Sequence, residues 1–161
     1  MKVARAVLIS VLFVVAVQGQ RPNRELDKWK ISSTVAEMTS DKRSHLELKS
    51  EDGKAMLSVT VLPGVTGIVV ITTGMVDKDQ IRIRFDNEDA FETWWNPADE
   101  HGAHIRYVAQ AENIVSKLAK MSTLRIEYHD IRSETTVLRF DVRGFSNALV
   151  RYKRVAKGNA K

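Results

Sequence analysis

Alternation of apolar and polar positions is the clearest pattern in this chain, and it predicts a β-rich fold. It is cleanest over residues 80–86, where Ile81, Ile83 and Phe85 alternate with polar or charged residues. Successive side chains of a strand point to opposite faces of a sheet, so this segment predicts a strand with one face buried and the other in water. The same alternation, or a short β-branched run, predicts further strands over residues 29–35, 45–49, 55–62, 67–73, 91–95, 124–129 and 138–143.

Helical spacing occurs late in the chain. In residues 107–121 the apolar side chains Val108, Ala111 and Val115 recur at three- and four-residue steps, which predicts an amphipathic helix. Ser146 can cap a short final helix. About eight short strands with one inserted helix favour an antiparallel sheet over alternating βαβ units. We therefore expect a mainly β fold (α+β by content), an antiparallel β-sandwich or barrel-like sheet with a helix near 107–121 and a short C-terminal helix.

The first nineteen residues have the layout of a secretory signal. A basic start at residues 1–5 precedes an apolar run at 6–17, and Gly19 supplies a small residue for cleavage. A spanning helix needs about 20 apolar residues, so this shorter run is typical of a cleaved signal, although a retained anchor is the alternative. We expect a cleaved signal at 1–19, a linker at 20–28, one β-rich domain at 29–152 and a fraying basic tail at 153–161.

Composition narrows the class of protein further. The chain has 25 Lys and Arg, 20 Asp and Glu, and no cysteine. Loss of Lys2 and Arg5 with the signal leaves 23 basic and 20 acidic residues, a net charge of +3 that does not indicate nucleic-acid binding. Small secreted eukaryotic domains are usually rich in disulfides, so a cysteine-free exported domain is more typical of the bacterial envelope. We expect a periplasmic or secreted protein with no membrane-spanning segment after cleavage.

One short segment has the residue types of a metal site. Residues 99–104 contain two carboxylates and the imidazoles of His101 and His104, which are ligand types for Zn²⁺ or Ni²⁺. The spacing is not that of a catalytic His-Glu-x-x-His helix, and a solvated polar loop is the favoured interpretation. The chain has no Gly-x-Ser-x-Gly elbow and no glycine-rich phosphate loop, so we expect no catalytic residue and no cofactor.

Charged strand faces are the second candidate. Three strands each place arginine and an acid on one face, namely Arg82 and Arg84 with Asp86, Arg125 with Glu127, and Arg139 and Arg143 with Asp141. If these strands are neighbours, arginines dominate one face of the sheet. The planar guanidinium suits carboxylates and phosphates, so this face is a candidate binding surface for an envelope protein or an anionic polymer. The alternative is a solvated face with weak cross-strand ion pairs.

A pair of tryptophans extends this hypothesis. Trp94 and Trp95 are adjacent in a predicted strand, so one should enter the core while the other lies nearer the surface. An exposed tryptophan beside Arg84 can stack on a sugar or another ring, whereas burial of both is the structural alternative. The candidate binding residues are therefore Arg82, Arg84, Trp95, Arg139 and Arg143.

The order of these features resembles a known family. The Ile-Arg-Ile-Arg-Phe-Asp run at 81–86, then Trp95 and Asp99, a helix near 114–118 and Phe-Asp-Val-Arg-Gly at 140–144 are similar to the second half of VasI-type proteins. Those are exported accessory proteins associated with type VI secretion systems. The resemblance implies a β-rich envelope protein and supplies no active site. We expect a non-catalytic envelope accessory or binding protein; the alternatives are a metal-dependent exported enzyme using residues 99–104 and a secreted factor acting on another cell.

Overall fold

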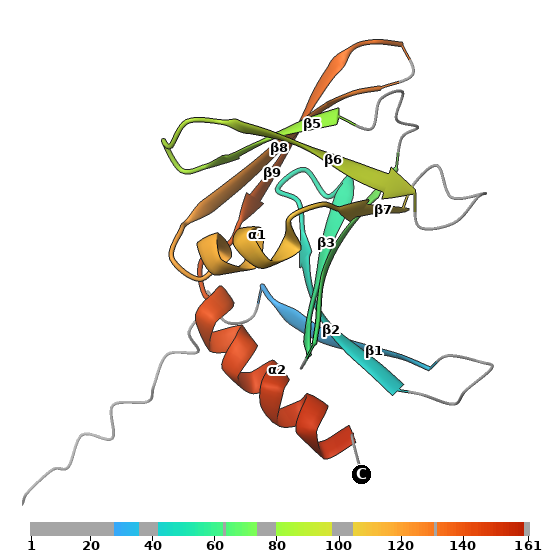
Figure 1. Ribbon diagram of the computed structural model, residues 1–161, viewed down its shortest axis with the longest axis vertical. Helices are drawn as coiled ribbons and strands as arrows, with labels where there is room; N and C mark the ends of the chain where they lie inside the picture. The colour runs from blue at the N-terminus through green and yellow to red at the C-terminus, as the bar shows by residue number, and fades with distance from the viewer. Residues whose placement is uncertain are drawn as a thin grey trace, which may run out of the picture.

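Nine strands and two helices form the part of the chain that the computed structural model describes, namely residues 28–35, 42–62, 64–73, 80–97, 105–130 and 132–159. All nine strands belong to one sheet in the order β1-β2-β3-β4-β7-β6-β5-β8-β9 (Figure 1). The elements are β1 (Lys30–Val35), β2 (Lys42–Lys49), β3 (Ala55–Leu62), β4 (Val65–Thr72), β5 (Gln80–Phe85), β6 (Phe91–Pro97), β7 (Ile105–Val108), α1 (Ala111–Leu118), β8 (Thr123–His129), β9 (Thr135–Asp141) and α2 (Phe145–Asn159).

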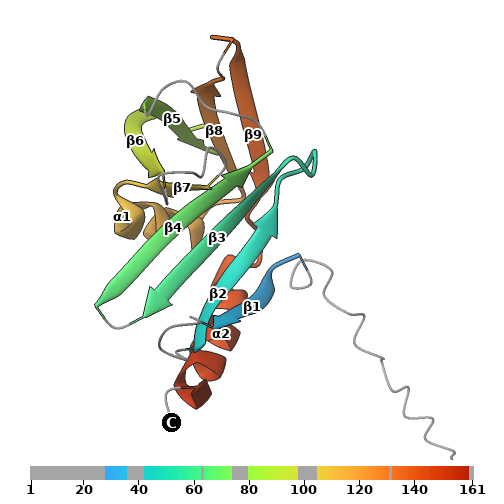
Figure 2. The ribbon, with the colours of Figure 1, turned by 90° about the vertical axis from the view of Figure 1, so that its right-hand side faces the viewer.

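The sheet is antiparallel throughout and curls into a half-barrel. Strands β1 to β4 form a meander, and β7 joins it to a second group made of β6, β5, β8 and β9. Figure 2 shows the first group as one broad layer with β5, β8 and β9 curling away behind it. The expected mainly β, antiparallel, barrel-like fold is therefore confirmed, with nine strands instead of about eight.

Alternation along the strands builds the core on the inner face of the curl. On β5, Ile81, Ile83 and Phe85 are buried while the residues between them are exposed. Helix α1 closes part of this core with Ile114 and Leu118. Each such apolar side chain contributes about 1.5–3 kcal/mol when fully buried. The residues that alternate with the core positions consequently lie on an outer face open to solvent.

Helix α2 covers the inner side of the first strands. It packs against β2 and, to a lesser extent, against β1 and β3. Its buried residues include Phe145, whose ring lies 5.0 Å from that of Trp29, and Tyr152, whose hydroxyl donates a hydrogen bond to the Ser44 carbonyl at 2.9 Å. These contacts connect the end of the described chain to its beginning.

Two turns position the second group of strands. Asp86 ends β5 in the left-handed region at φ 43°, and its carboxylate accepts hydrogen bonds from the backbone N–H groups of Ser122 and Thr123. The hairpin between β2 and β3 turns at Asp52-Gly53, with Gly53 at φ 72°. In that hairpin the Glu51 N–H donates to the Arg139 carbonyl at 2.8 Å, which connects it to the outermost strand β9.

The expected helix over residues 107–121 is wrong at its start. Residues up to Val108 form strand β7, which fills the gap between β4 and β6, and the helix begins only at Ala111. Gln110 separates the two elements in a left-handed conformation at φ 58°. Val108 therefore belongs to a strand, while Ala111 and Val115 belong to a helix, although all three fit one helical spacing. Pairing with β4 and β6 stabilises residues 105–108 as a strand.

The final helix is longer than expected. It has fifteen residues and includes residues 153–159, which we expected to lie in a fraying tail. Tyr152 is buried and Ala156 is partly buried against the core, so the packing face of the helix extends beyond the short final helix predicted from Ser146. Ser146 does not act as the cap, because its hydroxyl donates to the Ala119 carbonyl at 2.8 Å.

Several expectations lie outside the described residues. They are the signal at 1–19, nearly all of the linker at 20–28, and the possible metal ligands His101 and His104. Among the helices of the described segments, none has the length and apolar character needed to cross a membrane.

Candidate functional site

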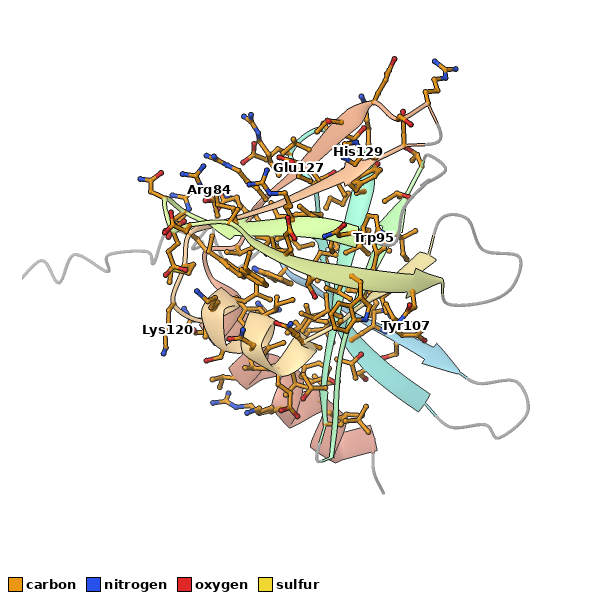
Figure 3. All side chains as sticks on the ribbon, turned by 45° about the horizontal axis from the view of Figure 1, so that its top comes forward. Arg84, Trp95, Tyr107, Lys120, Glu127 and His129 are labelled. Carbon is orange, nitrogen blue, oxygen red and sulfur yellow. The ribbon has the colours of Figure 1, made fainter. Side chains whose placement is uncertain are left out.

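Three arginines form a row across the outer face of β5, β8 and β9. Arg84 lies directly opposite Arg125, and Arg125 lies directly opposite Arg139. Such opposed positions place Cβ atoms about 4.5–5.5 Å apart. Figure 3 shows Arg84 on the side of β5 that faces away from helix α1 and Lys120. We call Arg84, Arg125 and Arg139 the arginine row.

The surroundings of the row neutralise its charge only in part. In the described part of the chain, Arg84 and Arg139 form no salt bridge, whereas the nearby Arg82 pairs with Glu127 at 3.3 Å. Asp86 lies near Arg125 and attracts it electrostatically, but its oxygens accept bonds from residues 122 and 123. Burial raises the pKa of the Asp86 carboxyl, but those hydrogen bonds outweigh burial and lower it overall. Asp86 therefore offsets part of the charge of Arg125, and the three guanidiniums of the row keep a net positive charge.

A shallow hollow of about 260 Å³ lies over this row. Four of its lining residues are arginines and one is an acid; the lining is Arg82, Arg84, Ala90, Arg125, Glu127, Val137 and Arg139. Two larger hollows of about 500 and 530 Å³ are lined by cations and carboxylates together. Guanidiniums outnumber carboxylates in the lining of the hollow over the row, which gives it the chemistry of an anion site.

A second cluster lies on the same outer face, on β5, β6 and β7. Trp94 and Tyr107 are large aromatic side chains with exposed fractions of 53% and 51%. Trp94 lies opposite Gln80, and Tyr107 lies opposite Asn96. The Gln80 side-chain amide donates to Glu92 Oε2 at 3.0 Å, a bond that crosses from β5 to β6. We call Gln80, Trp94, Asn96 and Tyr107 the aromatic–amide patch.

The expectation for Trp95 is corrected by the structure. Trp95 is fully buried, with its ring centroid 5.1 Å from that of Tyr128, so it does not lie on the binding surface (Figure 3). Its neighbour Trp94 takes that place. The pairing register between β6 and β5 decides which tryptophan faces outward, because Trp94 lies opposite Gln80, a residue of the outer face. Alternation alone established that the two tryptophans face opposite sides but not which one faces outward.

Arg143 also departs from the expected surface. It follows β9, and its guanidinium donates from Nε to Asp141 Oδ1 at 2.8 Å and from Nη2 to Oδ2 at 2.7 Å. Lys28 contacts the same carboxylate. The bonds from Arg143, followed by those from Lys28, hold the pKa of Asp141 well below its usual range. Arg143 therefore belongs to a clamp between β9 and the start of the described chain, not to the row.

The other predicted residues have mixed outcomes. Arg82, Arg84 and Arg139 lie exposed on the outer face as expected. Arg125, which the strand pattern placed on this face without singling it out, lies at the centre of the row. Among the described segments, no group of three His, Cys, Asp or Glu residues is arranged to hold a metal. The metal prediction for His101 and His104 stays a prediction, because both lie beyond those segments.

Comparison with known proteins identifies the fold. No family model matches the chain, and no curated protein matches it. The chain is similar in structure to invasion associated protein B from Bartonella henselae, known from a crystal structure, with a TM-score of 0.61 and 18% sequence identity. The match covers 81% of this chain and 94% of that one. At this level of identity the likeness is one of fold, a curled antiparallel sheet with two helices.

Proposed function

We propose that this chain is a non-catalytic binding protein of the bacterial envelope whose arginine row binds an anionic partner. The observation that carries the proposal is the direct opposition of Arg84, Arg125 and Arg139 on three neighbouring strands. Like charges at opposed positions destabilise a sheet. A bound anion supplies negative charge to the guanidiniums and offsets their repulsion. Binding therefore explains an arrangement that by itself costs stability.

The adjacent positions on the same strands show the contrast. Two residues along β5, Arg82 lies between Glu127 on one side and Glu92 on the other. That arrangement is the charge pattern expected of a solvated sheet face. The row spans three strands, or about 10 Å, and each guanidinium can form two parallel bonds to a carboxylate or phosphate. A partner with several regularly spaced anionic groups fits this geometry.

The envelope location rests on other observations. The signal-like residues 1–19 and the absence of cysteine support export by a bacterium. The structural neighbour is named for bacterial invasion, which is compatible with a protein of the cell exterior. The resemblance to VasI-type proteins supports an accessory role beside a secretion system.

A binding experiment tests the proposal with the whole chain. Labelled poly-L-glutamate serves as the anionic probe, and the test variant is Arg84→Glu with Arg139→Glu. The control is Arg151→Glu with Arg154→Glu, which makes the same change in net charge on exposed positions of α2, a helix that runs away from β5 and β8 (Figure 1). We expect the row variant to weaken affinity by at least about 10–100-fold, since the loss of even one hydrogen bond to a charged group costs about 1.5–3 kcal/mol.

The control variant should weaken binding much less. Equal losses in the two variants would mean that net charge alone governs binding, and no loss in the row variant would mean that the row is not the site. Either result contradicts the proposal. Unfolding curves for both variants ensure that the comparison is between folded proteins.

A further inference from the structure

We infer that the anionic partner is an acidic oligosaccharide, which contacts the arginine row and the aromatic–amide patch together. This inference rests on the proposed function and adds the class of ligand. The observation behind it is the presence of two half-exposed aromatic rings, Trp94 and Tyr107, on the same face as the row.

The chemistry of the aromatic–amide patch matches a sugar ring. A pyranose has an apolar face of C–H groups and a rim of hydroxyls. Trp94 and Tyr107 offer flat apolar surface, since each has an exposed fraction above one half. Gln80 and Asn96 lie next to them in the register and carry amides, which both donate and accept hydrogen bonds as hydroxyls require.

The two clusters lie close enough for one extended ligand. Gln80, opposite Trp94, and Arg84 are four residues apart on β5, which corresponds to about 13 Å along the strand. Arg82 lies between Gln80 and Arg84 on the same face of β5, so a further guanidinium lies between the arginine row and the aromatic–amide patch. The span exceeds a single ring and suits a chain of several sugars with its acidic groups over the row.

An acidic protein segment is the competing partner. It would be satisfied by the arginines alone and would not need amides beside exposed rings. The patch is thus the feature that favours a glycan, because Trp94 and Tyr107 expose two large rings beside amides on one face. The two partners make different demands on Trp94, and this difference provides the test.

The experiment compares three probes of similar length with the whole chain. Oligogalacturonate carries one carboxylate on each sugar, poly-L-glutamate carries carboxylates without sugars, and a maltooligosaccharide carries sugars without charge. Fluorescence anisotropy of labelled probes gives the affinity for every variant. In the unmodified protein, intrinsic fluorescence adds a second readout, since Trp94 is exposed while Trp29 and Trp95 have exposed fractions of 1% and 0%. We expect oligogalacturonate to bind most tightly and to shift the emission, and Trp94→Phe to keep much of the binding.

The substitution Trp94→Ala separates the two proposals. We expect it to weaken oligogalacturonate binding by about 5–10-fold and to leave poly-L-glutamate binding unchanged. Tyr107→Ala should act in the same direction. Equal affinity for the two anionic probes, together with no effect of Trp94→Ala, would overturn the glycan inference but leave the anion site intact. Insensitivity of both probes to Arg84→Glu with Arg139→Glu would instead overturn the proposed function.

Discussion

Reversing two charges in the arginine row should make the protein more stable while removing its binding. In the variant Arg84→Glu with Arg139→Glu, Arg125 lies between two carboxylates instead of two guanidiniums. Two repulsive cross-strand pairs become two attractive ones. Most charge substitutions at a sheet surface have little effect, so a gain in stability from a double substitution would be informative.

The size of the gain follows from the pairs involved. An opposite-charge cross-strand pair contributes about 0.2–1 kcal/mol, and like-charge neighbours on helices are unfavourable by about 0.2–0.5 kcal/mol. Summed over the two pairs and reduced by about half because Arg84 and Arg139 are exposed, the gain in unfolding free energy is about 1 kcal/mol. A change of this size raises the midpoint of thermal unfolding by about 4 °C in a domain of this length.

A matched control should change stability in the opposite direction. Arg82→Glu is the same substitution two residues away on β5, but it places a carboxylate between Glu92 and Glu127 and removes the 3.3 Å ion pair. We expect it to cost about 1 kcal/mol. The single variant Arg84→Glu completes the comparison, because Arg82→Glu and Arg84→Glu are the same residue change on the same strand and differ only in the residues that lie opposite them.

Urea unfolding at two salt concentrations measures both effects. At about 0.1 M salt the Debye length is about 10 Å and opposed charges interact, whereas at about 1 M it is about 3 Å. We expect the gain and the loss to shrink together at high salt. A row variant that is less stable than the unmodified protein, or a gain that does not depend on salt, would refute the reasoning from repulsion.

Three further predictions concern the fold around the site. Trp95→Ala should cost about 3–5 kcal/mol in unfolding free energy while Trp94→Ala stays within about 0.5 kcal/mol, as measured by chemical denaturation, because one ring is buried and the other exposed. Tyr152→Phe should cost about 1 kcal/mol by removing the hydrogen bond to the Ser44 carbonyl, and an unchanged midpoint of unfolding would show that this hydrogen bond does not stabilise the fold. Asp141 has a lowered pKa when folded, so its stabilisation is present above the ordinary value of 3.8 and is lost as the pH falls towards its folded pKa. Asp141→Asn should therefore lower stability near neutral pH and flatten the acid limb of the stability curve.

Local patterns predicted most of the strands because their cause is local. The alternation in residues 80–86 follows from one buried and one solvated face, and β5 has this burial pattern. Asp86, the last residue of that run, does not continue the alternation. Asp86 was expected to share the face of Arg84, but it ends the strand in a left-handed conformation and accepts hydrogen bonds from the start of β8. A side chain that contacts a distant segment is not visible in local alternation.

The arginine row could not be predicted because it depends on strand order. Arg84 and Arg125 are far apart in sequence and become neighbours only because β8 pairs with the free edge of β5. The alternation of each strand placed its arginines on the outer face but could not set the register. A shift of two residues would have placed Arg84 opposite Glu127 and produced an ordinary ion pair. The sequence therefore indicates an arginine-rich face, and the register turns it into a site.

Chemical-shift perturbation of arginine side chains tests the central claim most directly. In the labelled unmodified protein, the Nε–H resonances of Arg84, Arg125 and Arg139 are followed during titration with oligogalacturonate, and those of Arg151 and Arg154 on α2 serve as the internal reference. We expect the three resonances of the row to shift together and to saturate with a single affinity while the reference resonances stay in place. Shifts of equal size at the row and at α2, or a row that does not respond while other residues do, would contradict an anion site at this place.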